Sequence, residues 1–469
     1  MSPQTFDATK SSAAVIAAAV RDGRTTARKA TDDTLALIAR VDPKLHAFTN
    51  VLAAEARASA DAIDARRTRG ERLGALAGVP FAVKNLFDVA GLPTLAGSLI
   101  NRSNAPASAD ATLIAKLKAQ DAILLGALNM GEYAYDFTGE NVHYGNSLNP
   151  HATGQMSGGS SGGSGTAVAS GMAAIALGSD TNGSIRVPAS LCGLFGLKPT
   201  YGRLSRAGTF PFVASFDHLG PLARSVEDLA LCYDAMQGPD ALDHAQAARA
   251  IEPASSAIDA GVDGLRIAVA GGYFATGAMP EALEAVQQVA KALDTTSAIE
   301  IPEAHRARAA AYVITTVEGA ALHAERLRTR AKDFDPEVRN RLIAGAMFPA
   351  GVVVKAQKFR RWYREAVLRL FENVDVILAP ATPCRAPRTG QKNFLLNGVE
   401  MPVRANLGIF TQPISFIGLP VVSVPVWTDG EPLPIGVQII CAPWREDIAL
   451  RVARELELSG VVKAPVAQV

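Results

Sequence analysis

The sequence predicts one large α/β domain, and three observations support this fold class. The chain has 469 residues, of which 48% are hydrophobic, and this length can bury one large core or two modest ones. Helical patterns alternate along the chain with short apolar runs that are typical of interior strands. Because such runs occur both before and after a segment rich in Ala, Asp and Pro at residues 237–263, we expect one domain instead of two independent ones.

The N-terminal part of the chain, residues 1–70, is predicted to form a helical arm. Apolar residues recur at helical spacing in residues 12–22 and again in residues 26–41. Residues 53–69 predict a third helix that is largely polar outside its alanines, and Gly70 ends it.

A buried strand and a lysine open the next region, residues 71–236, where we expect the chemistry. The apolar run from Val79 to Val83 follows a Gly-Val-Pro turn and predicts an interior strand, with Lys84 at its end. A lysine at the end of a strand is most often a solvated charge. Here apolar residues stand on both sides of it, and partial burial would favour the neutral amine, which can act as a base.

Two further elements and a loop follow this strand. Residues 110–119 predict a helix and residues 122–128 a strand, which is the alternation of an α/β domain. Residues 129–149 are dense in polar and aromatic residues without periodicity, so we expect a loop over a pocket. Aromatic residues pack more often than they bind ligands, so both roles stay open for Tyr135.

The remaining elements can be assigned from caps and apolar runs. Residues 201–220 predict another loop, and the capping box that begins at Ser225 predicts a helix to Met236. Residues 237–263 are interpreted as a surface excursion. Beyond it the sequence predicts a strand at 265–270, helices at 280–293 and 309–330, one or two helices at 336–371, strands at 374–379, 419–426 and 435–441, and a final helix at 445–458.

The most unusual stretch is residues 153–200, in which small residues are crowded around SGGSSGGSGT at 157–166. A flexible linker is disfavoured because an apolar segment that we interpret as helical follows at once, at residues 167–177. A phosphate-binding loop of the P-loop type is also disfavoured, because the lysine that it needs before its serine or threonine is missing.

A serine hydrolase is the remaining interpretation of this stretch. A serine hydroxyl needs a base to take its proton, and that base is usually histidine. No histidine lies within the serine motifs, although His143, His151 and His218 are near in sequence. A Ser-Lys arrangement is a known variant of the same chemistry.

Composition excludes several other classes of function. Lys and Arg total 46 against 45 Asp and Glu, so the chain offers no global positive field, and we expect no direct binding to nucleic acid. The four cysteines and seven histidines are scattered without metal-ligand spacing, so we expect no metal and no cofactor. The short apolar run near the N-terminus has the flanks of neither a membrane span nor a secretion signal, and we expect a cytoplasmic protein.

Three separated motifs resemble the amidase signature family. They are GGSSGGS at 158–164, GSDTNGSIRVPASLCGLFGLKPT at 178–200, and GVPFAVK ending at Lys84. The resemblance extends over nearly the whole chain, including a Gly-Leu-Pro strand and a Pro-Ile-Gly-Val-Gln strand near its end. It implies a single amidase domain over residues 1–469, with a large mixed β-sheet covered by helices on both faces. Residues 264–469 would complete the sheet and the substrate pocket.

The resemblance also assigns catalytic roles. Ser184 matches the family nucleophile, Ser160 the bridging serine that follows a cis peptide bond at Gly159-Ser160, and Lys84 the base. Ser184 would attack an amide and form an acyl-enzyme. The oxyanion hole would be formed by backbone N–H groups of Thr181, Asn182, Gly183 and Ser184.

Two positions depart from the commonest family pattern, and they bear on the substrate. Asn182 stands where glycine is usual, and Asn85 follows the base where aspartate is common; we expect Asn182 to tolerate a positive φ. With VPASLCG and RANLG, these departures make the chain most similar to the 1-carboxybiuret hydrolase branch, which removes ammonia from a small carboxylated biuret in s-triazine degradation. The alternative is the amidase-type subunit of a tRNA-dependent amidotransferase, which passes ammonia to a partner.

A small anionic amide needs a cation in its pocket. Arg404 and Arg206 are the candidates, although each arginine taken singly is more often a surface or salt-bridged residue. As partners we expect a small-molecule amide, and a homodimer or a complex with a small accessory subunit. Other candidates for the pocket are Tyr135, Ser157 and Gln412, and Asp180 is expected to pair with Arg186 beneath the oxyanion turn.

Overall fold

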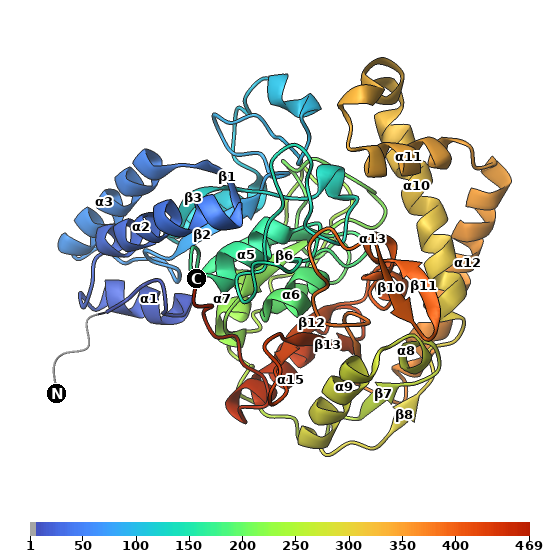
Figure 1. Cartoon of the computed structure of the whole chain (residues 1–469). Coiled ribbons are helices and arrows are strands. Elements are labelled where there is room, and N and C mark those ends of the chain that lie inside the picture. Colours follow the sequence, from blue (N-terminus) through green and yellow to red (C-terminus); the bar gives the residue numbers. More distant parts are fainter. Residues whose placement is uncertain (1–5) are drawn as a thin grey trace.

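The computed structural model describes residues 6–469, and these residues are built around one sheet of eleven strands (Figure 1). Strands that are far apart in sequence lie side by side in it. From one edge to the other the order is β1 (Phe48–Val51), β3 (Ile123–Leu128), β2 (Pro80–Lys84), β4 (Ile175–Asp180), β6 (His218–Ala223), β5 (Phe195–Lys198), β12 (Val421–Val426), β13 (Ile435–Cys441), β9 (Val376–Pro380), β7 (Ile267–Ala270) and β8 (Ala298–Ile299).

The sheet contains both parallel and antiparallel pairs. β2 is parallel to β3 and β4, and β7 is parallel to β8 and β9. The strands from β4 through β6, β5, β12 and β13 to β9 are antiparallel to their neighbours. The predicted mixed sheet is therefore confirmed. Two more strands, β10 (Asn393–Leu396) and β11 (Val399–Pro402), form a separate hairpin.

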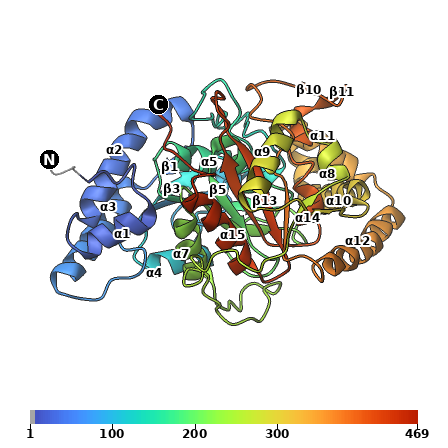
Figure 2. The same ribbon diagram turned by 90° about the horizontal axis from the view of Figure 1, so that it is seen from below.

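Helices cover both faces of the sheet, as predicted (Figure 2). α5 (Gly162–Ala169) and α6 (Arg186–Cys192) contact each other and the sheet, and α7 (Val226–Met236) and α15 (Glu446–Leu458) form a second such pair. The other helices after the N-terminal region are α4 (Thr112–Ala119), α8 (Tyr273–Thr276), α9 (Pro280–Ala292), α10 (Ala304–Arg330), α11 (Pro336–Ala346), α12 (Ala350–Leu370), α13 (Val403–Asn406) and α14 (Gln412–Ser415).

The N-terminal region contains the three predicted helices, α1 (Ala13–Arg21), α2 (Ala27–Leu45) and α3 (Ala53–Thr68). The hydroxyl groups of Ser12 and Thr26 cap α1 and α2 by accepting hydrogen bonds from the backbone N–H groups three residues further on. The sequence did not predict β1, which lies between α2 and α3 and pairs with β3. This strand has only four residues and no buried face, so it leaves no alternating pattern.

The prediction of a helical segment at residues 167–177 is only partly correct. α5 ends at Ala169, Gly171 adopts a φ of +80°, and β4 begins at Ile175. All residues of this stretch are buried. An apolar run that is buried on every side has no periodicity that separates a helix from a strand.

The second half of the catalytic region also contains strands that the sequence did not predict. The loop expected at residues 201–220 runs into β6, which begins at His218, and β5 precedes that loop. Further on, residues 336–371 form two helices, α11 and α12. Residues 237–263 contain neither helix nor strand.

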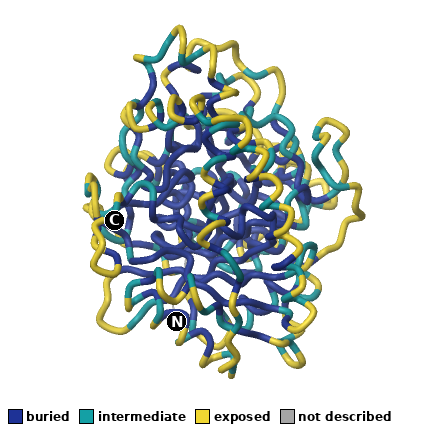
Figure 3. The backbone as a smooth tube through the Cα atoms, turned by 90° about the vertical axis from the view of Figure 1, so that its right-hand side faces the viewer, coloured by how far each residue is buried: buried dark blue, intermediate teal, exposed yellow. Residues whose placement is uncertain are grey.

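The core of the molecule is continuous and includes the whole Ser/Gly-rich stretch. Every residue from Met156 to Thr200 is buried, and Figure 3 shows that exposed residues lie at the periphery of the fold. Polar groups in this stretch therefore need partners within the protein or in a ligand. In residues 6–469 no single helix is long and apolar enough to cross a membrane, and only α11 and α12 taken together, across a bend of 97°, meet that test.

Candidate active site

Lys84 is fully buried at the end of β2 and contacts three serine hydroxyl groups. Its Nζ lies 2.6 Å from Ser160 Oγ, 3.0 Å from Ser161 Oγ and 2.9 Å from Ser179 Oγ. The pairing of β2 with β4 aligns Val83 with Leu177, so the lysine reaches the end of β4. Ser161 and Ser179 were not singled out in the sequence, although both lie within the motifs that carry the resemblance.

Burial lowers the pKa of Lys84 to about 7, although the carboxylates of Asp180, Asp217 and Asp136 favour its charged form. A desolvated ammonium group without a contacting carboxylate loses its proton readily. A neutral amine has two N–H donors and one lone pair, so it can donate to two of the three hydroxyl groups and accept from the third. Lys84 can therefore act as a proton acceptor near neutral pH.

Ser160 follows a cis peptide bond, Gly159-Ser160, as the resemblance implies. The loop here is tightly packed: a Cβ atom added to Gly159 would lie 2.4 Å from Asp136 Oδ2. Asp136 also accepts hydrogen bonds from the backbone N–H groups of Thr138 and Gly139, at 3.0 and 2.7 Å. This carboxylate thus fixes the loop that faces the bridging serine.

The turn from Thr181 to Ser184 presents free backbone donors. Within residues 6–469 none of its four N–H groups donates a hydrogen bond to the protein. Gly183 has a φ of +140°, and a Cβ atom there would lie 2.1 Å from Thr411 Oγ1. The positive φ that was expected at Asn182 therefore occurs at Gly183. Free N–H groups next to a serine are the arrangement that stabilises an oxyanion.

Asp180 and Arg186 lie beneath this turn and form a fully buried ion pair. The guanidinium Nε and Nη2 donate to the two carboxylate oxygens, each at 2.9 Å. Although burial opposes ionisation, the charge of Arg186 holds the pKa of Asp180 well below its usual range. Arg186 Nη1 also donates to Gln438 Oε1 at 2.6 Å, which ties the turn to β13.

Ser184 opens onto a small cavity with a volume of about 30 Å³. Its hydroxyl group makes no hydrogen bond with any residue of the described part of the chain. Two other polar atoms of the wall, Tyr135 Oη and Asn182 Oδ1, are buried and also have no partner. The remaining wall residues include Phe137, Thr181, Phe212, Tyr312, Thr315, Arg341 and Gln412.

Arg341, on α11, places a positive charge in this cavity. Its guanidinium lies 3.9 Å from the centre of the Tyr135 ring and donates to the backbone oxygens of Tyr135 and Glu337, the latter at 2.8 Å. It forms no ion pair within residues 6–469. Burial lowers the pKa of this guanidinium, which nevertheless remains charged. Sequence reasoning missed Arg341, because nothing near it in the chain signals a site.

The two arginines proposed from the sequence are both paired with carboxylates. Arg404 Nε lies 3.2 Å from Asp136 Oδ1, and its Nη1 lies 3.1 Å from Asp335 Oδ2. Arg206 pairs with Asp243 at 3.2 Å. Neither lines the cavity at Ser184.

The other proposed pocket residues differ in position. Tyr135 and Gln412 line the cavity, and Gln412 Oε1 accepts a hydrogen bond from Arg308 Nε at 3.0 Å. Ser157 does not line it: its hydroxyl group is buried and donates to the backbone oxygen of Ser147 at 2.7 Å. Within residues 6–469 no three His, Cys, Asp or Glu side chains are grouped to hold a metal ion.

Comparison with known proteins places this geometry in context. A family model described as Amidase matches residues 29–450. AtzE of Pseudomonas sp. (strain ADP), which is a 1-carboxybiuret hydrolase subunit, is 53% identical over 445 residues, which are 95% of this chain and 97% of that protein. The corresponding subunit of the glutamyl-tRNA(Gln) amidotransferase of Chromohalobacter salexigens is 36% identical over 472 residues, which are 94% of this chain and 95% of that protein.

A solved structure is similar over nearly the whole fold. It is an s-triazine catabolic enzyme described as part of an unexpected vestigial protein complex. The two chains superpose with a TM-score of 0.96 at 52% sequence identity, and the match covers 97% of this chain and 100% of the other.

Proposed function

This chain belongs to the amidase family of hydrolases that act on C–N bonds, and we propose that its substrate is a small anionic amide, 1-carboxybiuret, from which it releases ammonia. The observation that carries the proposal is the unpaired guanidinium of Arg341 in the cavity at Ser184. A substrate carboxylate would give that buried charge the partner that it lacks. The relative that is 53% identical belongs to a 1-carboxybiuret hydrolase.

The proposed reaction begins with a proton transfer along three side chains. Neutral Lys84 takes a proton from Ser160, which takes the proton of Ser184, and Ser184 Oγ attacks the amide carbonyl. The 2.6 Å contact between Lys84 and Ser160 supports the first step. The negative charge that forms on the carbonyl oxygen is stabilised by N–H groups of the turn at 181–184, a contribution of roughly 3 kcal/mol per donor.

The C–N bond then breaks, and the proton returns along the same path to the leaving nitrogen. Ammonia departs and leaves an acyl group on Ser184. A water molecule, deprotonated by the same base, attacks the acyl carbon and restores the serine. Lys84 is suited to both steps because a pKa of about 7 lets it accept and return a proton near neutral pH.

The size of the cavity supports a small substrate. A volume of about 30 Å³ corresponds to no more than roughly two water molecules. Even a small amide requires some movement of the wall formed by Tyr135, Tyr312 and Arg341, and a bulky aryl amide would require far more.

Ammonia release from 1-carboxybiuret by the purified chain tests the proposed substrate. We expect a much higher kcat/KM for 1-carboxybiuret than for biuret, because biuret lacks the carboxylate that Arg341 would bind. Equal values for the two compounds would contradict the proposed role of the substrate charge.

The alternative function, that of the amidase-type subunit of a glutamyl- or aspartyl-tRNA amidotransferase, is supported by relatives at 36–37% identity. Such a protein would show glutaminase activity only with a tRNA-binding partner and tRNA. Ammonia release from 1-carboxybiuret without tRNA favours the first proposal, and strict dependence on tRNA would overturn it.

The chain is also proposed to act as a homodimer or in a complex with a small accessory protein. A complex is supported by the structure at 52% identity, which was solved as a protein complex. Sedimentation of the purified chain, alone and after co-expression with its neighbouring genes, distinguishes these forms from a monomer.

A further inference from the structure

The Asn182 side chain is held in one orientation inside the cavity. It is only 6% exposed, and its Nδ2 donates to Thr315 Oγ1 on α10 at 3.0 Å. Its backbone oxygen accepts a hydrogen bond from Thr411 Oγ1 at 2.6 Å. Because both ends of the residue are anchored, the amide group cannot turn away from the cavity.

This anchoring leaves one strong acceptor without a partner. Asn182 Oδ1 is buried and accepts no hydrogen bond within the described part of the chain. A buried acceptor that stays unpaired costs about 1–3 kcal/mol, so such groups in native proteins need an explanation. Asn182 is two residues before Ser184 and lines the same cavity, and a bound substrate is the partner that explains it.

The wall of the cavity carries three kinds of polar group. Asn182 Oδ1 is an acceptor, the unpaired Tyr135 hydroxyl can donate, and Arg341 is a cation. A carboxylated biuret carries the complementary set, which is N–H, C=O and carboxylate. Alkyl diamides such as malonamide have a CH₂ group where biuret has the N–H between its two carbonyls.

We propose that Asn182 Oδ1 accepts a hydrogen bond from the N–H between the two carbonyls of a biuret-type substrate, and that Thr315 positions it to do so. Asn182 thereby selects biuret-type amides over alkyl diamides. This inference rests on the proposed function, because it concerns the substrate of the same Ser184 site.

Biuret and malonamide form a matched pair for the test, because they differ only in N–H against CH₂. Their kcat/KM values are measured by ammonia release for the full-length chain. A site that hydrogen-bonds a substrate N–H rejects the analogue that lacks it, so we expect biuret to be preferred by about tenfold or more. In Asn182→Gly the ratio should fall to within about threefold of unity, mainly through a lower value for biuret.

Thr315 supplies an independent test with its own controls. Thr315→Val removes the anchor of the Asn182 amide and should lower the biuret preference, whereas Thr315→Ser keeps a hydroxyl and should restore it. Thr316→Val is the matched control: Thr316 is buried on the same helix and donates to backbone oxygens of Tyr312 and Val313 instead. This control should keep the wild-type ratio.

The outcomes separate this inference from the proposed function. If wild type hydrolyses 1-carboxybiuret but Asn182→Gly and Thr315→Val keep the wild-type ratio, the inference is overturned and the proposed function stands. If wild type hydrolyses malonamide but neither biuret nor 1-carboxybiuret, both are overturned. Should Asn182→Gly fail to fold, the three α10 variants alone decide the matter.

Discussion

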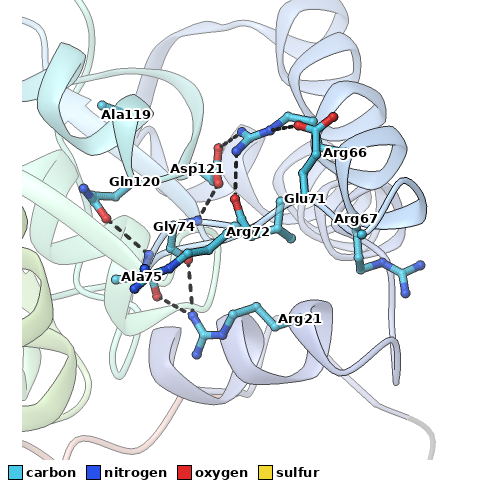
Figure 4. A pocket seen from close by; sticks show the side chains of 12 residues that line it. Arg21, Arg66, Arg67, Glu71, Arg72, Gly74, Ala75, Ala119, Gln120 and Asp121 are labelled. Atoms are coloured by element: carbon cyan, nitrogen blue, oxygen red, sulfur yellow. Dashed lines mark hydrogen bonds and ion pairs between the residues drawn. The ribbon is translucent and has the colours of Figure 1, made fainter.

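The molecule contains two polar cavities that differ in one informative respect. The larger, with a volume of about 850 Å³, lies between the N-terminal region and α4 and is lined by Arg21, Arg66, Arg67 and Arg72 (Figure 4). The cavity at Ser184 has a volume of only about 30 Å³ and a single arginine in its wall. Size and formal charge would therefore choose the larger cavity as the binding site.

The hydrogen bonds of the two cavities favour the opposite choice. In the larger cavity Arg66 pairs with Asp121 and Glu71, and Arg21 donates to the backbone oxygens of Gly74 and Ala75. Arg72 is exposed to water. In the smaller cavity buried groups remain unpaired beside a serine. Unused hydrogen-bonding capacity in a buried place thus identifies the site better than volume does.

The largest effect is expected from Ser184, the nucleophile of the smaller cavity. Ser184→Ala should lower kcat by roughly 10⁴–10⁶, as the loss of a serine nucleophile does in other hydrolases. The thermal midpoint Tm should stay close to wild type, because the Ser184 hydroxyl makes no hydrogen bond in the fold. A variant that retains a tenth of the wild-type rate would remove Ser184 from the mechanism.

A similarly large effect is expected at Lys84, with a distinct dependence on pH. Burial lowers the pKa of Lys84 to about 7, so its base form is present above that pH and is lost as the pH falls through about 7. We therefore expect wild-type kcat/KM to rise with pH through about 7 and then level off.

The Lys84→Ala variant provides the control for this profile. It should lose several orders of magnitude of activity at neutral pH, because no other base contacts Ser160, and recover part of it at high pH. If the variant kept the wild-type inflection near pH 7, another group would be responsible for that titration.

A smaller and selective effect is expected at Arg341. Arg341→Ala should raise KM for 1-carboxybiuret about 10- to 100-fold, since it removes a charge-assisted contact worth about 1.5–3 kcal/mol. The kinetics of uncharged biuret should change much less. Arg206→Ala is the matched control, because Arg206 is paired with Asp243 away from the cavity, and it should leave the ratio between the two substrates unchanged.

The smallest effect is expected in the larger cavity. Arg72→Ala should leave kcat/KM unchanged, and Arg66→Ala should lower Tm slightly by releasing Asp121 and Glu71 from their ion pairs. Steady-state kinetics and thermal unfolding of both variants check this. A loss of activity in Arg72→Ala would show that the larger cavity takes part in the reaction and would undo the comparison.

Much of the catalytic centre could be predicted from the sequence because its parts are local. The motifs around Ser160 and Ser184 are continuous stretches, and Lys84 ends a strand that is recognisable by itself. The structure adds the contact between Lys84 and Ser179, which depends on the pairing of β2 with β4. That pairing joins segments that are distant in the sequence and has no signature in either one.

The substrate pocket was less predictable for the same physical reason. Arg341 lies on α11 and reaches Ser184 only because α10 and α11 pack beside the oxyanion turn, and its own sequence environment is that of an ordinary amphipathic helix. Arg404 and Arg206 looked equally suitable in the sequence. Only the carboxylates that the fold brings next to them show that their charges are already balanced.

Peptide mapping after treatment with a serine-directed covalent inhibitor tests the central claim most directly. Among the serines of the site, only Ser184 has an unpaired hydroxyl beside free backbone donors. We predict one modified residue per chain, at Ser184, and loss of that label in both Ser184→Ala and Lys84→Ala. Labelling at Ser160 or at a serine outside the cavity, with Ser184 unmodified, would contradict the account.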